Sequence, residues 1–147
     1  MNAPNLQALL ARALRALLPL NSSAAELWNI PSGTVFRISR TIISTNSSPD
    51  LPFEQSINPY QGCEHGCVYC YARPSHARFG LSPGLDFESR LFAKSAAPAL
   101  LESHLRRPGY RCKTILLGAN PDPSQPIERR LGLTRRILGV LSDFNHP

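Results

Sequence analysis

The feature that most constrains the fold is a regular alternation of apolar runs and helical patterns in the last 60 residues or so of the chain. Residues 89–94 predict a short buried strand, and residues 96–107 predict a helix with a proline in its first turn and a Pro-Gly stop. Residues 113–119 contain a continuous apolar run, typical of a strand buried on both faces. Residues 127–144 carry leucine and isoleucine near helical spacing. Strand, helix, strand and helix joined by short loops predict a parallel α/β arrangement.

The 147 residues divide into three predicted segments. Residues 1–33 form a Leu/Ala-rich leader, helical or disordered, in which two arginines interrupt the apolar stretches and argue against a secretory signal. Residues 34–56 comprise a β-branched strand over 34–44 and a Pro-rich linker, with a short strand expected around 55–58. Residues 57–147 carry the α/β pattern.

Three of the four cysteines lie in one short stretch, at Cys63, Cys67 and Cys70, with the spacing C-x3-C-x2-C. Secreted disulfide scaffolds spread many cysteines along a short chain, so this cluster indicates a metal site in a reducing, cytoplasmic compartment. Thiolates select zinc or iron–sulfur centres. A structural zinc site needs four ligands, and His65 or His76 would complete it. On a 4Fe-4S cluster, three cysteines leave one iron open to a substrate or cofactor.

This motif, with Tyr69 directly before the third cysteine, resembles the signature of the radical S-adenosylmethionine superfamily. The segments SINPYQGCEHGCVYCYARP, GLDFESRLFAK and GANPDPSQPIERRLGLTRRIL are similar to bacterial radical proteins related to spore photoproduct lyase, often described as DNA repair photolyase-like. The resemblance covers residues 40–147 and implies a (β/α) barrel. Because a complete barrel takes about 200–250 residues, we expect a partial barrel, truncated after two to three β/α units. A small open sheet, complete as it stands, is the alternative.

The resemblance also implies a mechanism. Cys63, Cys67 and Cys70 would each ligate one iron of a 4Fe-4S cluster, and S-adenosyl-L-methionine would bind the fourth iron. Reductive cleavage of that cofactor would give a 5′-deoxyadenosyl radical, which abstracts hydrogen from a substrate. A reductant such as flavodoxin or ferredoxin is the implied partner.

Four further residues are expected to bind the cofactor. The resemblance places Tyr69 near the adenine. Lys94, Asn120 and Asp122 stand at predicted strand ends, where the chemistry of parallel α/β folds is located.

The chain departs from the family pattern in the loop over residues 120–126. Pro121 and Ser124 stand where relatives have threonine and tyrosine, which removes polar and aromatic groups from a loop that would face the cofactor. Ala119 occupies the position of a hydrogen-donating cysteine in spore photoproduct lyases. Cys112 lies one strand length earlier and is not expected to replace it, so thymine-dimer reversal is not predicted.

The composition limits the partners. The 16 lysines and arginines against 10 acids give a net charge of +6, which together with the family description favours nucleic acid as the substrate, although helical arginines also need a solvated face. A membrane partner is not expected, since no apolar run reaches the roughly 18–20 residues that span a bilayer. Whether the chain is an active enzyme stays open. The alternatives are an iron–sulfur-binding fragment without activity and a structural zinc module.

Overall fold

The structure is a computed structural model, and it describes residues 34–37 and 39–147. The chain divides into two compact units, residues 1–30 and 31–147, and only the second contains described residues. The predicted leader therefore lies outside them. In the described part of the chain, no helix is long and apolar enough to cross a membrane.

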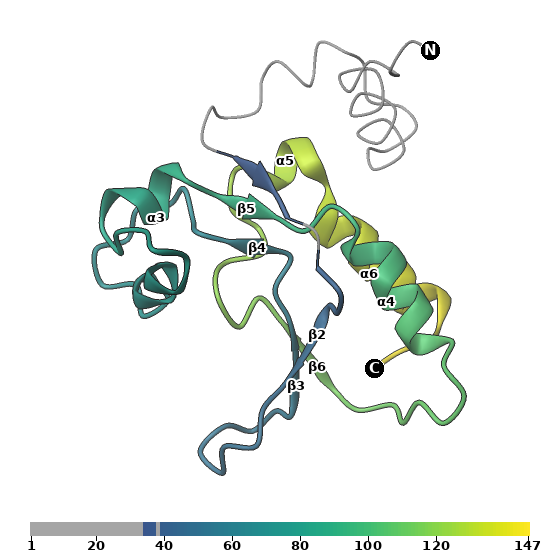
Figure 1. The fold of residues 1–147 in the computed structure, drawn as a ribbon. Coiled ribbons are helices and arrows are strands. Elements are labelled where there is room, and N and C mark those ends of the chain that lie inside the picture. The colour runs from purple at the N-terminus through teal and green to yellow at the C-terminus, as the bar shows by residue number, and fades with distance from the viewer. Residues whose placement is uncertain (1–33, 38) are drawn as a thin grey trace, which may run out of the picture. The chain divides into compact units, whose positions relative to one another are not determined.

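The described strands form two small sheets, each with one parallel and one antiparallel pair (Figure 1). In the first sheet β5 (Phe92–Ala93) is central, parallel to β1 (Val35–Phe36) and antiparallel to β4 (Tyr60–Gln61). In the second, β3 (Gln55–Ile57) is central, antiparallel to β2 (Ile43–Thr45) and parallel to β6 (Ile115–Leu117). The barrel stays a prediction.

The single strand predicted over 34–44 is wrong, because its two ends belong to different sheets. Val35 N donates to the Leu91 carbonyl at 2.7 Å, next to β5, whereas Ile43 pairs with Ile57 of β3. The strand expected around 55–58 is confirmed as β3. Pairing partners distant in sequence thus decide where a β-branched run is divided.

The predicted helix over 96–107 is confirmed as α4 (Ala97–Leu105). The helix predicted over 127–144 divides into α5 (Glu128–Leu131) and α6 (Leu133–Asp143), since Gly132 adopts a left-handed φ of +57° that ends the first helix. Two helices were not predicted: a 3₁₀ helix, η1 (Arg73–Phe79), and α3 (Leu85–Ser89). Ser89, the first residue of the strand predicted over 89–94, lies in α3.

The main core lies where α4 and α6 pack together beside β3 (Figure 1). Leu101, Ile137 and Ile57 are fully buried there, each contributing about 1.5–3 kcal/mol from removal of apolar surface from water. The expectation that residues 113–119 are buried on both faces is wrong. Among the described strands β6 pairs with β3 alone, and Leu116 keeps 38% of its surface exposed.

Candidate metal centre

Residues 62–72, here called the cysteine loop, connect β4 to η1. The three cysteines of this loop differ in burial. Cys63 is buried, Cys70 is half-buried and Cys67 is exposed, and all three are free thiols. The backbone holds the loop at two points. Cys63 N donates to the Phe87 carbonyl of α3 at 2.8 Å, and Cys70 N donates to the Cys67 carbonyl at 3.2 Å, which closes a turn between the last two cysteines.

Burial raises the pKa of the Cys63 thiol, and the charges of Asp122, Cys70 and Cys67 raise it further, while a hydrogen bond from the His65 backbone opposes the shift. Asp122 and the other two thiols are thus close enough to Cys63 to act on it electrostatically. A metal ion that binds here displaces the thiol protons, since the thiolate is the ligand.

The three thiols could serve as ligands in a mononuclear zinc site or in an iron–sulfur cluster. Among the described residues, no three His, Cys, Asp or Glu side chains converge on one point that a single ion could occupy. A mononuclear zinc site requires such convergence, with every ligand atom about 2.0–2.3 Å from the ion. An iron–sulfur cluster distributes its cysteines over separate irons. The three free thiols of the loop are ligands that either kind of centre uses.

The two histidines that could complete a zinc site each have a partner at Nε2, while Nδ1 of His76 has none among the described residues. His76 is completely buried, its Nε2 lies 2.9 Å from the Arg90 carbonyl oxygen, and its ring packs against Phe79, Phe87 and Phe92. His65 Nε2 lies 3.2 Å from an Asp122 carboxylate oxygen.

Gly62 allows the loop to begin close to this aromatic core. Its φ is +80°, and a Cβ there would lie 2.9 Å from Leu91 Cδ2, 2.9 Å from the Phe87 carbonyl oxygen and 3.0 Å from His76 Cε1. No residue with a side chain fits this position without displacing its neighbours. The start of the loop is therefore packed against Phe87 of α3, His76 of η1 and Leu91.

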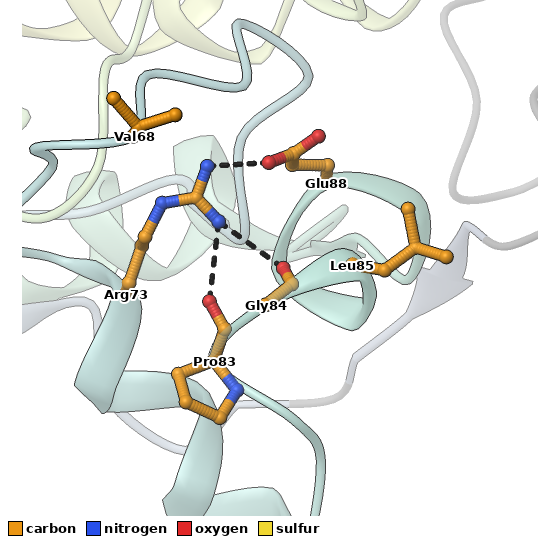
Figure 2. Close-up of a pocket in the computed structure, with 6 residues that line it drawn as sticks. All are labelled: Val68, Arg73, Pro83, Gly84, Leu85 and Glu88. Carbon is orange, nitrogen blue, oxygen red and sulfur yellow. Dashed lines mark hydrogen bonds and ion pairs between the residues drawn. The ribbon is translucent and has the colours of Figure 1, made fainter.

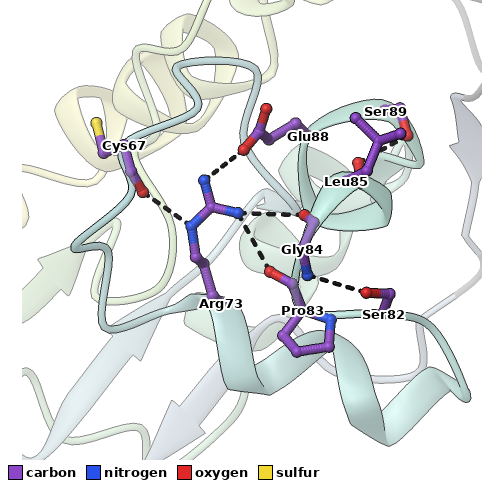
Figure 3. A network of polar contacts seen from close by, with 8 residues as sticks. All are labelled: Cys67, Arg73, Ser82, Pro83, Gly84, Leu85, Glu88 and Ser89. Atoms are coloured by element: carbon purple, nitrogen blue, oxygen red, sulfur yellow. Dashed lines mark hydrogen bonds and ion pairs between the residues drawn. The ribbon is translucent and has the colours of Figure 1, made fainter.

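Arg73 fixes the other end of the loop (Figure 2). Its Nη1 donates to the carbonyls of Pro83 and Gly84 at 3.2 and 3.1 Å, and its Nη2 forms an ion pair with Glu88. Figure 3 adds the contact to the cysteine loop: Arg73 Nε donates to the Cys67 carbonyl at 2.8 Å. One guanidinium thus ties the turn between Cys67 and Cys70 to the start of α3.

The same residues line a pocket of about 530 Å³, together with the apolar side chains of Val68 and Leu85 (Figure 2). Sequence reasoning missed both Arg73 and Glu88. The signal for Arg73 was an arginine three positions after the last cysteine of the motif. Nothing in the sequence indicated which acid would pair with it.

The loop over residues 120–126 lies against the cysteine loop, as its predicted position at a strand end requires. Gln125 makes the closest connection and is completely buried. Its Nε2 donates to the carbonyls of Gly62 and Asp122 at 3.0 and 3.2 Å, and its Oε1 accepts from Glu64 N at 3.2 Å. Tyr71 adds a hydrogen bond from its hydroxyl to the Ala119 carbonyl. Gln125 was not predicted, because glutamine in a Pro-rich loop is ordinarily solvated.

The four residues expected to bind a cofactor differ in their surroundings. Asp122 lies beside the cysteine loop through its contact with His65, whereas Tyr69 keeps 87% of its surface exposed. Lys94 and Asn120 instead line a second, smaller cavity of about 150 Å³. Burial lowers the pKa of Lys94, and the nearby charge of Arg37 lowers it further.

The comparisons with known proteins give relatives without an assigned activity. The chain is 42% identical over 97 residues to an uncharacterised protein of Mycobacterium tuberculosis, and equally similar to one of Mycobacterium bovis. The alignment covers 66% of this chain and 28% of each relative, so the chain spans well under a third of the length of the curated proteins that it matches. No family model matches the chain. No solved structure matches it significantly.

Proposed function

We propose that this chain carries the cluster-binding part of a radical S-adenosylmethionine protein. Cys63, Cys67 and Cys70 would each hold one iron of a 4Fe-4S cluster, and the bound cluster and cofactor would supply a one-electron route to hydrogen abstraction. The observation that carries the proposal is the loop itself. Three free thiols lie on a single short segment that is fixed at both ends, with the spacing C-x3-C-x2-C.

The surrounding residues have assignable tasks in this proposal. Gly62 and Arg73 hold the loop ends, so the thiols are presented from a rigid backbone. Gln125 brings the segment with Asp122 against the loop, so the Asp122 carboxylate would lie near a bound cluster. Tyr69, exposed next to Cys70, is left available to contact a bound adenine.

The proposal includes the fold, in which this chain would contribute β/α units to a (β/α) barrel. The protein would be cytoplasmic, where thiols stay reduced. The electron would come from a flavodoxin or ferredoxin, and nucleic acid is the substrate class favoured by the family resemblance and the net charge of +6.

Anaerobic reconstitution tests the cluster. We expect about four irons per chain and a broad absorbance from thiolate-to-iron charge transfer, both lost in Cys63→Ser, Cys67→Ser and Cys70→Ser. Cys112→Ser is the matched control, because Cys112 is an exposed thiol distant in sequence from the loop. Stoichiometric zinc with no iron in the reconstituted protein would refute the proposal.

Cofactor cleavage separates the enzyme from an iron–sulfur protein without activity. With dithionite and S-adenosylmethionine, the loaded chain should produce 5′-deoxyadenosine and methionine. Full iron loading without either product would support the second candidate, which is favoured by the exposure of Tyr69.

A further inference from the structure

The cavity lined by Lys94 lies outside the cysteine loop and has a chemistry of its own. Its volume is about 150 Å³, roughly that of five water molecules at ~30 Å³ each. The lining residues are mostly polar and come from the ends of strands in both sheets and from η1: Ser44, Asn58, Gln61, Ser75, Arg78, Phe79, Lys94 and Asn120. Two of them are cationic and none is acidic.

Both cations lack a partner in the described part of the chain. Within residues 34–37 and 39–147, the Lys94 ammonium and the Arg78 guanidinium make no ion pair and no side-chain hydrogen bond. Arg37 adds a third positive charge that acts on Lys94, while its own Nη1 donates to Gln61 at 3.0 Å. Arg37 and Arg78 are exposed to water, but the half-buried Lys94 ammonium receives no counter-charge from the described residues, which destabilises the fold.

The neutral groups of the cavity, like its two cations, suit an anionic ligand. Asn58 Oδ1 already accepts a hydrogen bond from Asn120 N at 2.7 Å, and the Asn58 amide nitrogen has no partner in the described chain. Ser44 contributes a hydroxyl that donates to no described residue. The cavity therefore offers an ammonium, a guanidinium, an amide and a hydroxyl as donors, and no carboxylate.

We propose that this cavity binds a phosphoryl oxyanion, held by Lys94 and Arg78. Phosphate presents several acceptor oxygens and at least one negative charge, which match the cluster of donors and the uncompensated positive charge. The small volume accommodates one phosphate group with little of the molecule that bears it. Within the proposed function, and resting on it, this phosphate belongs to the substrate rather than to S-adenosylmethionine, which carries none.

The test is calorimetric titration of the full chain with inorganic phosphate at constant ionic strength. Wild type should bind phosphate, and Lys94→Gln and Arg78→Gln should each weaken binding about tenfold or more, because each removes a charged hydrogen bond. Lys94→Arg should retain most of the affinity, since the charge remains. Arg111→Gln is the matched control: it removes an equal charge from an exposed arginine outside the cavity and should have little effect.

A short single-stranded oligonucleotide, titrated in the same way, identifies the source of the phosphate. Tighter binding than inorganic phosphate, weakened by the same two variants, assigns a phosphodiester; binding of inorganic phosphate alone assigns a free phosphate or a monoester. The proposal is overturned if wild type binds neither probe, or if Arg111→Gln weakens binding as much as Lys94→Gln does. Circular dichroism melts confirm that each variant is folded.

Iron content, measured on the same samples, separates this proposal from the proposed function. Phosphate binding that depends on Lys94 in a chain that takes up no iron would leave the cavity assigned and the radical function refuted. A full cluster without phosphate binding would support the cluster of the proposed function and refute the phosphate site.

Discussion

Replacing Arg73 by methionine is expected to release the turn between Cys67 and Cys70 from α3. The guanidinium donates to the carbonyls of Cys67, Pro83 and Gly84 and forms an ion pair with Glu88, and only 14% of the Arg73 side chain is exposed. Methionine has a similar length but none of these donors. The variant should therefore lose stability and iron together.

The unfolding free energy lost in Arg73→Met depends on the hydrogen bonds and water contacts that remain to the partners of Arg73. Removing one member of a buried ion pair costs about 3–5 kcal/mol. Here Glu88 is 33% exposed and can regain water, and the Cys67 and Gly84 carbonyls each keep a hydrogen bond, from Cys70 N and Phe87 N. We therefore expect Arg73→Met to lower the free energy of unfolding by about 2–3 kcal/mol, nearer the value for charged hydrogen bonds.

Arg90→Met is the matched control. Arg90 directly follows α3 and forms an ion pair with Asp86 of that helix at 3.3 Å, but its side chain is 60% exposed. Exposed pairs contribute about 0–1 kcal/mol. Urea unfolding and iron per chain are measured on both variants after anaerobic reconstitution. If Arg73→Met and Arg90→Met lose the same stability and load the same iron, Arg73 does not hold the loop.

Three other perturbations test the site. Gly62→Ala should cost about 1–3 kcal/mol more in urea unfolding than Gly109→Ala, because both glycines have φ near +80° but only at Gly62 would a Cβ collide with neighbours; equal losses would contradict the close packing. Gln125→Leu should lower the unfolding free energy by about 1–3 kcal/mol and speed the loss of iron to a chelator, since buried groups of the cysteine loop lose their partner; unchanged iron release would mean that the two loops are not coupled. Burial lowers the pKa of Lys94 in the native state below the value of about 10.4 that it has in the unfolded chain. Between these two pKa values the unfolded chain binds more protons than the native one, so wild-type stability rises with pH in this interval. Lys94→Gln should remove this slope and be the more stable protein at pH 7 in chloride buffer, and identical slopes from pH 7 to 10 would contradict the argument.

Features set by neighbouring residues could be predicted from the sequence. The helix α4 was found because a proline in the first turn and a Pro-Gly stop act within a few residues of the helix itself. The strand β6 was found in the same way, from a short apolar run. The three cysteines belong to one short segment, so their spacing alone indicated that they act together.

Features that depend on partners distant in the chain could not be predicted from the sequence. The division of residues 34–44 between two sheets follows from pairing with β5 and β3, which no local pattern specifies. The roles of Arg73 and Gln125 depend on carbonyls presented by other loops. The sequence predicted a cofactor role for Lys94, and only the structure shows that Lys94 and Arg78 line one cavity.

The sequence by itself thus determined which residues are candidates for binding a metal, because ligand chemistry and short spacings are properties of the chain. Only the tertiary structure decided how those residues are held and which charges lack partners. Burial, hydrogen bonding and electrostatic pairing are properties of groups brought together from distant segments, as the Arg73 contacts to Cys67 and Glu88 illustrate.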